Sequence, residues 1–376
     1  MKKTILTTAS ILAFAIAAPA SAQSLITPDG VSGNQSDIDQ NGNNNDASVS
    51  QGPGVENLAE IDQDGNRNEA VIDQQNANPA GMVGFSNAAN EALIIQDGDD
   101  AFASIEQDSQ GPSTNDNNDA SVTQYSAGGA GFDVDSRLSS LSVSPATNTG
   151  AVADNAAVVR QTSGRNNNAD IDQGVDGGAV TGNLAYVEQI GSGHDATILQ
   201  TGNDNAALVD ESGFTLADSN NDVDIVQTGN GNLADIDQDG SDLTTMVTQS
   251  GLDNQAYVMD QQGMNNEITI TQTGNENLAT IDDQNGSGNA ITVDQFGFAD
   301  EVLISQDGTG NTSNTTQTGT GAGGNYAKVS QTGNDNLSNI TQDGESNTAT
   351  VTQTSDNNVS NINQNGTGNT ATVTQG

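Results

Sequence analysis

The sequence predicts an all-β fold: a parallel β-solenoid with two strands in each rung of about 22 residues, its rungs stacked as in cross-β structure. Two observations indicate this fold. A short unit that ends in glutamine recurs along the chain, and the usual step between successive glutamines is 11 residues. Within each unit the side chains alternate with a period of two, which is typical of a half-buried strand and not of a helix.

The repeat has asparagine, a small residue, a β-branched residue and glutamine at every second position. Two consecutive copies show it at Asn57, Ala59, Ile61 and Gln63, and at Asn68, Ala70, Ile72 and Gln74. We count 26 copies from Gln40 to Gln375, one of which ends in Glu211 instead of glutamine. The positions that we expect to form a structural ladder include Gln40, Gln51, Asn57, Gln63, Asn68, Gln74, Asn232, Gln238, Asn336, Gln342, Asn347, Gln353, Asn358, Gln364, Asn369 and Gln375.

Each copy reads as a seven-residue strand followed by a four-residue turn, and two copies make one rung. The turn lies in the sequence Gln-x-Gly-x-x-Asn, in which Gly and Asn tolerate the positive φ of a tight reversal. Stacking lets each strand pair with the equivalent strand above and below at about 4.8 Å. The 26 copies therefore predict thirteen rungs and a rod of roughly 60 Å.

The inward side of each strand is predicted to carry the repeated residues. Ala and Ser permit the two sheets to approach closely, while Ile and Val fill the middle. A buried amide is costly unless it is hydrogen-bonded. When the same amide recurs in register, each can donate to the amide on the next rung and form a ladder, as in steric zippers. This requirement explains why the repeat is strict.

The N-terminus has the features of a secretory signal peptide. A basic start precedes an apolar run over Ile5–Ala18 and an Ala-x-Ala cleavage site before Gln23. The run falls short of the ~20 residues that span a bilayer, so we expect secretion and no membrane insertion after cleavage. The predicted segments are a signal peptide over 1–22, an N-terminal segment over 23–33, seven copies over 34–124, a Gly/Ser-rich linker or loop over 125–154, and nineteen copies over 155–376.

Smaller irregularities interrupt the pattern. Single-residue slips at Asp283-Gln284 and near Asp260-Gln261 predict β-bulges. Insertions that can bulge from turns without disturbing the stack fall at Gln75–Ala89, Gly174–Gly182, Ser212–Asn220 and Thr318–Gly324.

Composition excludes several classes of protein. The formal net charge is −43, and removal of Lys2 and Lys3 with the signal peptide makes it −45. Such a chain is repelled by nucleic acid and by anionic lipid. Cysteine is absent, so disulfides and thiol chemistry are absent too, although a secreted protein could hold disulfides. No motif for a catalytic triad, a phosphate loop or a metal cluster is present, and we expect no enzyme activity and no cofactor.

Three weaker chemical signals have simpler explanations. Asp37 and Asp39, and likewise Asp235, Asp237 and Asp239, match the opening of a calcium loop, but the twelfth position lacks the bidentate Glu. Strand alternation already explains these residues. The single histidine, His194, stands in the opening Asn position of a copy. An outward threonine array that could suggest ice binding is small and consists of Thr348, Thr350, Thr352, Thr370, Thr372 and Thr374.

The full motif Gln-x-Gly-x-x-Asn-x-Ala-x-x-x-Gln resembles the curlin-associated repeat of curli fibre subunits. It occurs complete five times, starting at Gln40, Gln63, Gln227, Gln342 and Gln364, and degenerate versions cover most of the chain. This chain is longer than a usual subunit of about five repeats, is more acidic, and opens its strands with Asn where the family often has Ser.

The resemblance implies a function and partners. Curlin subunits cross the outer membrane through a secretion pore, polymerise at the bacterial surface, often on a nucleating minor curlin, and serve adhesion and biofilm matrix. By resemblance, the Gln and Asn ladder would polymerise the chain. The last strand, Asn369–Gln375, ends one residue before the end of the sequence, and the first opens at Asn34. Both ends are therefore expected to present unpaired strand edges.

We therefore predict a secreted structural subunit of curli-like amyloid fibres. The alternative is a monomeric acidic β-solenoid that acts as a surface adhesin or binds ice or calcium. An enzyme that acts on polysaccharide is a more distant third, because it needs irregular loops rich in catalytic side chains.

Overall fold

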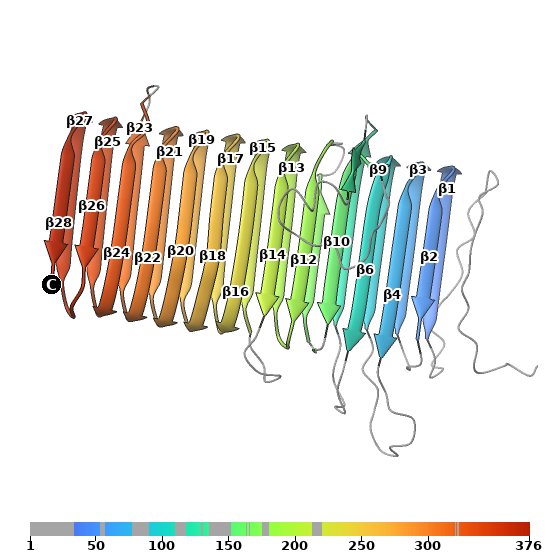
Figure 1. The fold of residues 1–376 in the computed structure, drawn as a ribbon. Coiled ribbons are helices and arrows are strands. Elements are labelled where there is room, and N and C mark those ends of the chain that lie inside the picture. Colours follow the sequence, from blue (N-terminus) through green and yellow to red (C-terminus); the bar gives the residue numbers. More distant parts are fainter. Residues whose placement is uncertain are drawn as a thin grey trace, which may run out of the picture.

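A computed structural model shows a long rod of stacked strands that runs from β1 to β28 (Figure 1). The structure describes residues 34–52, 57–76, 90–109, 118–128, 131–134, 152–162, 164, 166–174, 180–212, 220–319, 321 and 323–376. The predicted signal peptide, the N-terminal segment and most of the predicted insertions at Gln75–Ala89, Gly174–Gly182 and Ser212–Asn220 lie outside these residues. Among the described residues, no helix is long and apolar enough to cross a membrane.

Two sheets of 13 strands each form the rod. Sheet A contains, in spatial order, β1 (Gln35–Asn43), β3 (Leu58–Asn66), β5 (Glu91–Asp99), β7 (Asp119–Ala127), β11 (Asn168–Gln173), β13 (Asp195–Asn203), β15 (Asp222–Asn230), β17 (Thr244–Leu252), β19 (Glu267–Asn275), β21 (Ala290–Phe298), β23 (Thr312–Gly319), β25 (Leu337–Glu345) and β27 (Val359–Thr367).

Sheet B is built from the strands that alternate with these along the chain. It contains β2 (Asp46–Gln51), β4 (Glu69–Asn76), β6 (Ala101–Ser109), β10 (Asn155–Thr162), β12 (Leu184–Ile190), β14 (Ala206–Ser212), β16 (Leu233–Ser241), β18 (Gln255–Met264), β20 (Leu278–Ser287), β22 (Glu301–Thr309), β24 (Tyr326–Asn334), β26 (Thr348–Gln353) and β28 (Thr370–Gln375).

The strands pair in parallel, and equivalent repeat positions stand over one another. In sheet A, for example, Ala59 pairs with Ala92, and Ile61 pairs with Ile94. Each of the 26 strands corresponds to one copy of the repeat, so the prediction of an all-β parallel solenoid with two strands per rung is confirmed.

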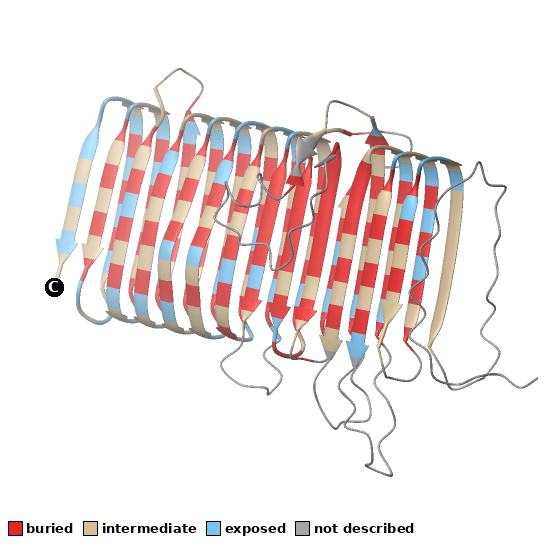
Figure 2. Ribbon diagram, turned by 45° about the vertical axis from the view of Figure 1, so that its right-hand side comes forward, coloured by how far each residue is buried: buried red, intermediate tan, exposed pale blue. Residues whose placement is uncertain are grey.

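The inward faces of the two sheets form one continuous core. Its members are the Ala and the Ile or Val of successive copies, such as Ala234, Ile236 and Ile270, which are 0–1% exposed. Buried and less buried residues alternate along most strands as bands in Figure 2. The period of two in the sequence thus places the small and β-branched residues inside, as predicted.

The strands are longer than the predicted seven residues in many copies, because pairing continues through the glycine of the turn. Gly42 pairs with Gly65, and Gly65 with Gly98. A Cβ on Gly42 would overlap the carbonyl oxygen of Gly65, and its φ is +117°. Only glycine fits such a position. The chain then reverses at the residue before the asparagine, where Arg67, for example, has a φ of +61°.

Two bulges lie at the predicted slips. The register of β16 with β18 shifts between Ile236 and Gln238, and that of β20 with β22 shifts between Ile281 and Asp283. β18 and β20 lie next to each other and pair Val258 with Ile281 and Gln261 with Gln284, so their extra residues stack. The bulges therefore keep the glutamines aligned.

The segment predicted as a linker or loop does not divide the stack. β7 pairs with β11 and β6 pairs with β10 across it, so the copies on both sides share the same two sheets. Part of the segment is ordered strand, because β7 continues to Ala127 and the short strands β8 (Phe132–Asp133) and β9 (Val152–Ala153) form an antiparallel pair. The sequence pattern could not reveal this pair, since it lacks the repeat.

Candidate functional site: the amide ladders and the open ends

The glutamines that close the copies form a hydrogen-bonded ladder along each sheet. Gln40 Nε2 donates to Gln63 Oε1 at 2.7 Å, and Gln63 Nε2 donates to Gln96 Oε1 at 2.8 Å. In sheet A this chain of bonds continues through every strand to Gln364. The donor always lies in the earlier rung and the acceptor in the later one, so the ladder has a direction.

Ladder glutamines also tie the two sheets together. Gln63 Nε2 donates to the backbone oxygen of Asp46 in sheet B, at 3.1 Å. Gln74 Nε2 donates in the same way to the backbone oxygen of Leu58 in sheet A, at 2.9 Å. One amide nitrogen thus supplies a ladder bond and a bond across the rung. Because both side chains are 0% exposed, these bonds remove the cost of burying the amide.

The asparagines bond the backbone more than they bond one another. Asn45 Oδ1 accepts the backbone N–H of Asn68 in the next rung at 3.1 Å, and Asn45 Nδ2 donates to the backbone oxygen of Gly65 at 3.1 Å. Direct amide-to-amide bonds add to this in some rungs, for example from Asn254 Nδ2 to Asn232 Oδ1 at 3.1 Å. The asparagine column therefore holds each turn against the next one. The sequence predicts only a side-chain ladder at these positions.

Several copies carry substitutes in the ladder columns. His194 stands in an asparagine position, where its backbone N–H donates to Asn167 Oδ1 at 3.1 Å. Burial lowers the pKa of His194 to about 4, so the ring is neutral at pH 7. Asp300 also stands in an asparagine position, and burial raises its pKa. Glu211 replaces a glutamine, and it is the one substitute in the two glutamine columns.

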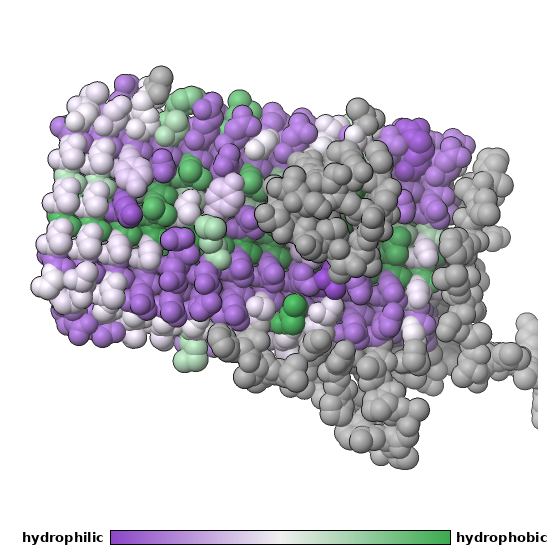
Figure 3. Space-filling view, viewed as in Figure 1, coloured by the Kyte–Doolittle hydropathy of each residue, from purple (hydrophilic) through white to green (hydrophobic). Residues whose placement is uncertain are grey.

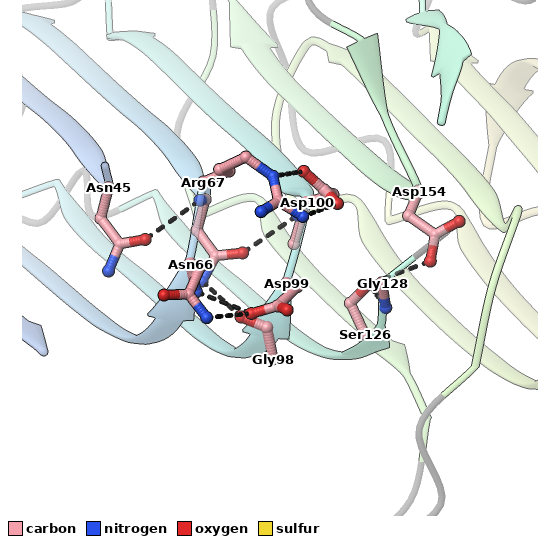
Figure 4. Close-up of polar contacts among 11 residues, drawn as sticks. Asn45, Asn66, Arg67, Gly98, Asp99, Asp100, Ser126, Gly128 and Asp154 are labelled. Atoms are coloured by element: carbon pink, nitrogen blue, oxygen red, sulfur yellow. Dashed lines mark hydrogen bonds and ion pairs between the residues drawn. The ribbon is translucent and has the colours of Figure 1, made fainter. Parts of the chain in front are cut away.

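Polar contacts between successive rungs also hold the turns (Figure 4). Arg67 donates from Nε and from Nη2 to the carboxylate of Asp100, each at 2.6 Å. Beside this pair, Asn66 Nδ2 donates to Asp99 Oδ1 at 2.8 Å. These contacts lie at the exposed edge of the rod, where ion pairs add little stability.

The outward faces are strongly acidic. Rows of similar hydropathy run along the rod on the face drawn in Figure 3, because identical positions stack. Asp210 stands over Asp237 in sheet B. Partial desolvation, together with neighbouring carboxylates, raises the pKa of each of these two residues to about 6. The rod therefore carries like charges in columns, which salt screens.

The weak calcium candidates are not brought together. Asp37 and Asp39 lie on β1, in the first strand of sheet A, whereas Asp235, Asp237 and Asp239 lie on β16 of sheet B. In the part of the chain that the structure describes, no group of three or more His, Asp or Glu side chains could hold a metal ion. The alternation of the strand accounts for the positions of these aspartates.

The two ends of the rod present the outer strands of both sheets. β1 and β2 form one end, and β27 and β28 form the other (Figure 1). Within the described residues, each of these four strands pairs with a strand on one side only. At the far end Val359 is 53% exposed, and Ala371 and Val373 are only partly buried. An unpaired edge of this kind is a template for another strand.

Comparison with known families agrees with the geometry. The family described as the curlin associated repeat matches residues 181–213, 219–251, 240–274 and 263–297. A comparison with curated proteins gives no match. The matched residues therefore carry curlin-associated repeats within the β-solenoid, which supports a curlin-repeat protein. The resemblance read from the sequence is confirmed, and the same rung geometry extends beyond the matched residues, from β1 to β28.

Proposed function

We propose that this chain is a secreted structural subunit of extracellular curli-like fibres, which grow by head-to-tail stacking of strands. The single observation that carries the proposal is that the end strands of the described rod, β1 with β2 and β27 with β28, match each other. Three features of these end strands support the proposal: the backbone register, the direction of the glutamine ladders and the charges of the outward residues.

The register supports a junction without any insertion or slip. β27 begins at Val359 and β28 at Thr370, and β1 begins at Gln35 and β2 at Asp46, so the offset within the rung is 11 residues at both ends. Placing β27 under β1 and β28 under β2 of a second copy aligns all of the inward residues. The aligned pairs are Ser360 with Ser36, Ile362 with Ile38, Gln364 with Gln40, Ala371 with Ala47, Val373 with Val49 and Gln375 with Gln51.

The direction of the ladders supports the same junction. Gln364 Nε2 donates across the rung to the backbone oxygen of Thr348 at 2.9 Å, and Gln375 Nε2 donates to that of Val359 at 3.0 Å. Each amide has a second N–H, which in the other glutamine rungs donates to the side-chain oxygen of the next ladder residue. At the opposite end the side-chain oxygens of Gln40 and Gln51 accept from no described ladder residue. Donors at one end therefore meet acceptors at the other.

Charge supports a head-to-tail arrangement as well. The outward residues of β27 and β28 are Asn and Thr, apart from Val359, and none is charged. The outward residues of β1 include Asp37 and Asp39. The junction would place Asn361 and Asn363 beside these two aspartates, so that amides instead of carboxylates face them. This avoids the repulsion found between stacked aspartates inside the rod.

The fibre would act in cell adhesion and in the biofilm matrix at the bacterial surface. Its main partner is a second copy of the same chain. A nucleating minor curlin and an outer-membrane secretion pore are further partners, which the curlin repeats support by analogy only. The high negative charge speaks against binding to nucleic acid. The proposed role is structural and requires neither catalysis nor a cofactor.

The substitution Thr372→Pro tests the open end. In sheet B the N–H groups of outward residues donate to the next rung, as from Thr348 N to Asn369 O at 2.7 Å. By the same pattern, the N–H of Thr372 faces the open edge and makes no bond inside the rod. Proline removes this donor and blocks the approach of another strand. Thr372→Val keeps the N–H and is the matched control.

We expect Thr372→Val and the unchanged chain to form fibres seen by electron microscopy and thioflavin fluorescence, and Thr372→Pro alone to form none. A small fraction of Thr372→Pro added to the unchanged chain should shorten the fibres, because the variant can join through β1 and β2 but cannot be extended. If Thr372→Pro grows fibres as the unchanged chain does, stacking at this end is wrong. If neither chain assembles at any concentration, the alternative of a monomeric acidic adhesin is favoured.

A further inference from the structure

The ladder of sheet B is interrupted at one rung. Its glutamine bonds run from Gln51 to Gln189, which donates to Glu211 Oε2 at 2.8 Å. They resume with Gln238, which donates to Gln261 Oε1 at 2.8 Å, and continue to Gln375. Between β14 and β16 no ladder bond is present, although Glu211 stands directly over Gln238.

Two oxygen atoms at this interruption have no hydrogen-bond donor. They are Glu211 Oε1 and Gln238 Oε1, and both atoms are buried. The side chains that carry them are each 0% exposed. In the other rungs, the position of Glu211 Oε1 is taken by an amide nitrogen that donates to the glutamine oxygen of the next rung. A carboxylate has no such hydrogen, so two acceptors stand where a donor and an acceptor are needed.

The amide nitrogen of Gln238 cannot supply the missing donor. This nitrogen already donates its two hydrogens, one to Gln261 Oε1 at 2.8 Å and one to the hydroxyl oxygen of Thr245 at 3.0 Å. Thr245 is a 0% exposed residue of the facing sheet, and its hydroxyl donates in turn to Gln261 Oε1 at 2.8 Å. The hydrogen bonds around Gln238 are therefore satisfied except for one donor hydrogen between Glu211 Oε1 and Gln238 Oε1.

We propose that Glu211 is held as a neutral carboxylic acid whose O–H donates to Gln238 Oε1, so that the contact between β14 and β16 is a rung whose ladder bond depends on a proton. The hydrogen restores the direction of the ladder, because the donor again lies in the earlier rung. When the proton is lost, a carboxylate remains buried against an amide oxygen, which is unfavourable.

The surroundings of Glu211 favour the neutral form. Burial raises the pKa of Glu211 well above 4.5, and Asp195 and Asp222 on the facing sheet and Asp210 on its own strand raise it further. The bond from Gln189 lowers the pKa, by less than burial raises it but by more than any one of these aspartates raises it. On the outward side of sheet B, the strands next to β14 carry two further acidic groups, Glu188 on β12 and Asp237 on β16. The cation on that side, Arg160 of β10, donates to Glu188 at 2.6 Å and to Glu106 at 3.2 Å.

The sign of the pH dependence follows from the raised pKa. A carboxyl group whose folded-state pKa is raised contributes stability that is fully present below its unfolded value of 4.5 and is lost as the pH rises through the folded value. Other carboxyl groups of the chain are shifted in the same direction. A test must therefore compare variants at each pH, and not only one protein across the pH range.

The substitution Glu211→Gln isolates the proposed bond, because glutamine supplies a donor at every pH. We expect Glu211→Gln to raise the guanidinium midpoint of unfolding at pH 8 and to leave it unchanged at pH 4. The exposed residue Glu301, whose replacement by glutamine removes one charge without touching the ladder, provides the control. Glu301→Gln should show no such divergence between the two pH values.

Infrared spectroscopy gives a direct readout on the full chain. The C=O stretch of a protonated carboxylic acid should persist at pH 7 in the unchanged chain and in Glu301→Gln, and it should weaken in Glu211→Gln. A difference in midpoint that is the same at pH 4 and pH 8, or a protonated band that Glu211→Gln leaves unaltered, would overturn the proposal. Both measurements report on the folded rod itself, so they stand or fall independently of fibre growth.

Discussion

The middle of the rod, from β6 to β14, differs from the region from β15 to β28 on its outward side. In the second region the outward residues are mostly Asp, Asn and Thr. In the middle region, β10, β12 and β14 are buried along most of their length on both sides (Figure 2). Their inward residues are the same in kind as elsewhere, since Ile198 and Ile270 are both 0% exposed. The two regions thus share a core and differ in what covers the outer face.

A second apolar cluster causes this difference. It lies on the outer face of sheet B, beneath Val134 and Ala153 from the segment between β7 and β10. Its buried members from the strands are Phe102, Ala156, Val158, Leu184, Tyr186, Ala206 and Leu208. Beside it, Arg160 bridges Glu106 and Glu188. The inward face therefore fixes the fold, while the outward face of sheet B is free to acquire a separate packing layer.

The largest effect is expected in the turn column of the regular region. A Cβ on Gly274, whose φ is +118°, would overlap the carbonyl oxygen of Gly297. Gly274→Ala should therefore cost more than about 4 kcal/mol in the free energy of unfolding, or prevent folding. Gly288, with a φ of +65°, has no atom within 4 Å of such a Cβ. Gly288→Ala should cost only about 1–2 kcal/mol, and equal costs would contradict the stacked turns.

Substitution of the shared core should affect both regions alike. Ile198→Ala in the middle region and Ile270→Ala in the regular region should each cost about 2–5 kcal/mol, because each leaves a cavity between two closely packed sheets. Denaturant unfolding measures both values. A much smaller cost in one region would mean that its inward face does not carry the same share of the stability.

Substitution of the outer face should separate the two regions. Leu184 and Leu278 occupy the same position of the repeat, but Leu184 is 0% exposed under the second cluster and Leu278 is half-buried. Leu184→Ser should cost about 2–3 kcal/mol, and Leu278→Ser should cost less than about 1 kcal/mol. The same unfolding assay applies, and similar costs would show that the second cluster does not stabilise the rod.

The smallest effect concerns the carboxylates at the border of the two regions. The pKa of Asp210 and that of Asp237 are both raised from 3.8 to about 6. Their stabilising effect is therefore present below pH 3.8 and is lost as the pH rises through about 6. Asp237→Asn should stabilise the rod at pH 8 by less than about 1 kcal/mol, because solvent screens these partly exposed groups. A larger gain at pH 4 than at pH 8 would contradict this sign.

Much of the candidate site could be read from the chain because the repeat is local. The step of 11 residues sets the rung, and the alternation sets which side chains face inward. Even the bulges could be predicted, since an extra residue at Asp283 or near Asp260 shifts the pattern by one. The signal peptide stays a prediction, since it lies outside the described residues.

The sequence alone determined the fold class, the number of strands in the two stacked sheets and the inward residues, because each depends on spacing between residues close in the chain. Only the tertiary structure decided how the amides are bonded. It gave the glutamine ladders a direction, turned the asparagines toward the backbone and left one oxygen of Glu211 and one of Gln238 without a donor. It also gathered Phe102, Val134 and Leu184 into one outer cluster. These contacts join residues far apart in the sequence, and no local period encodes them.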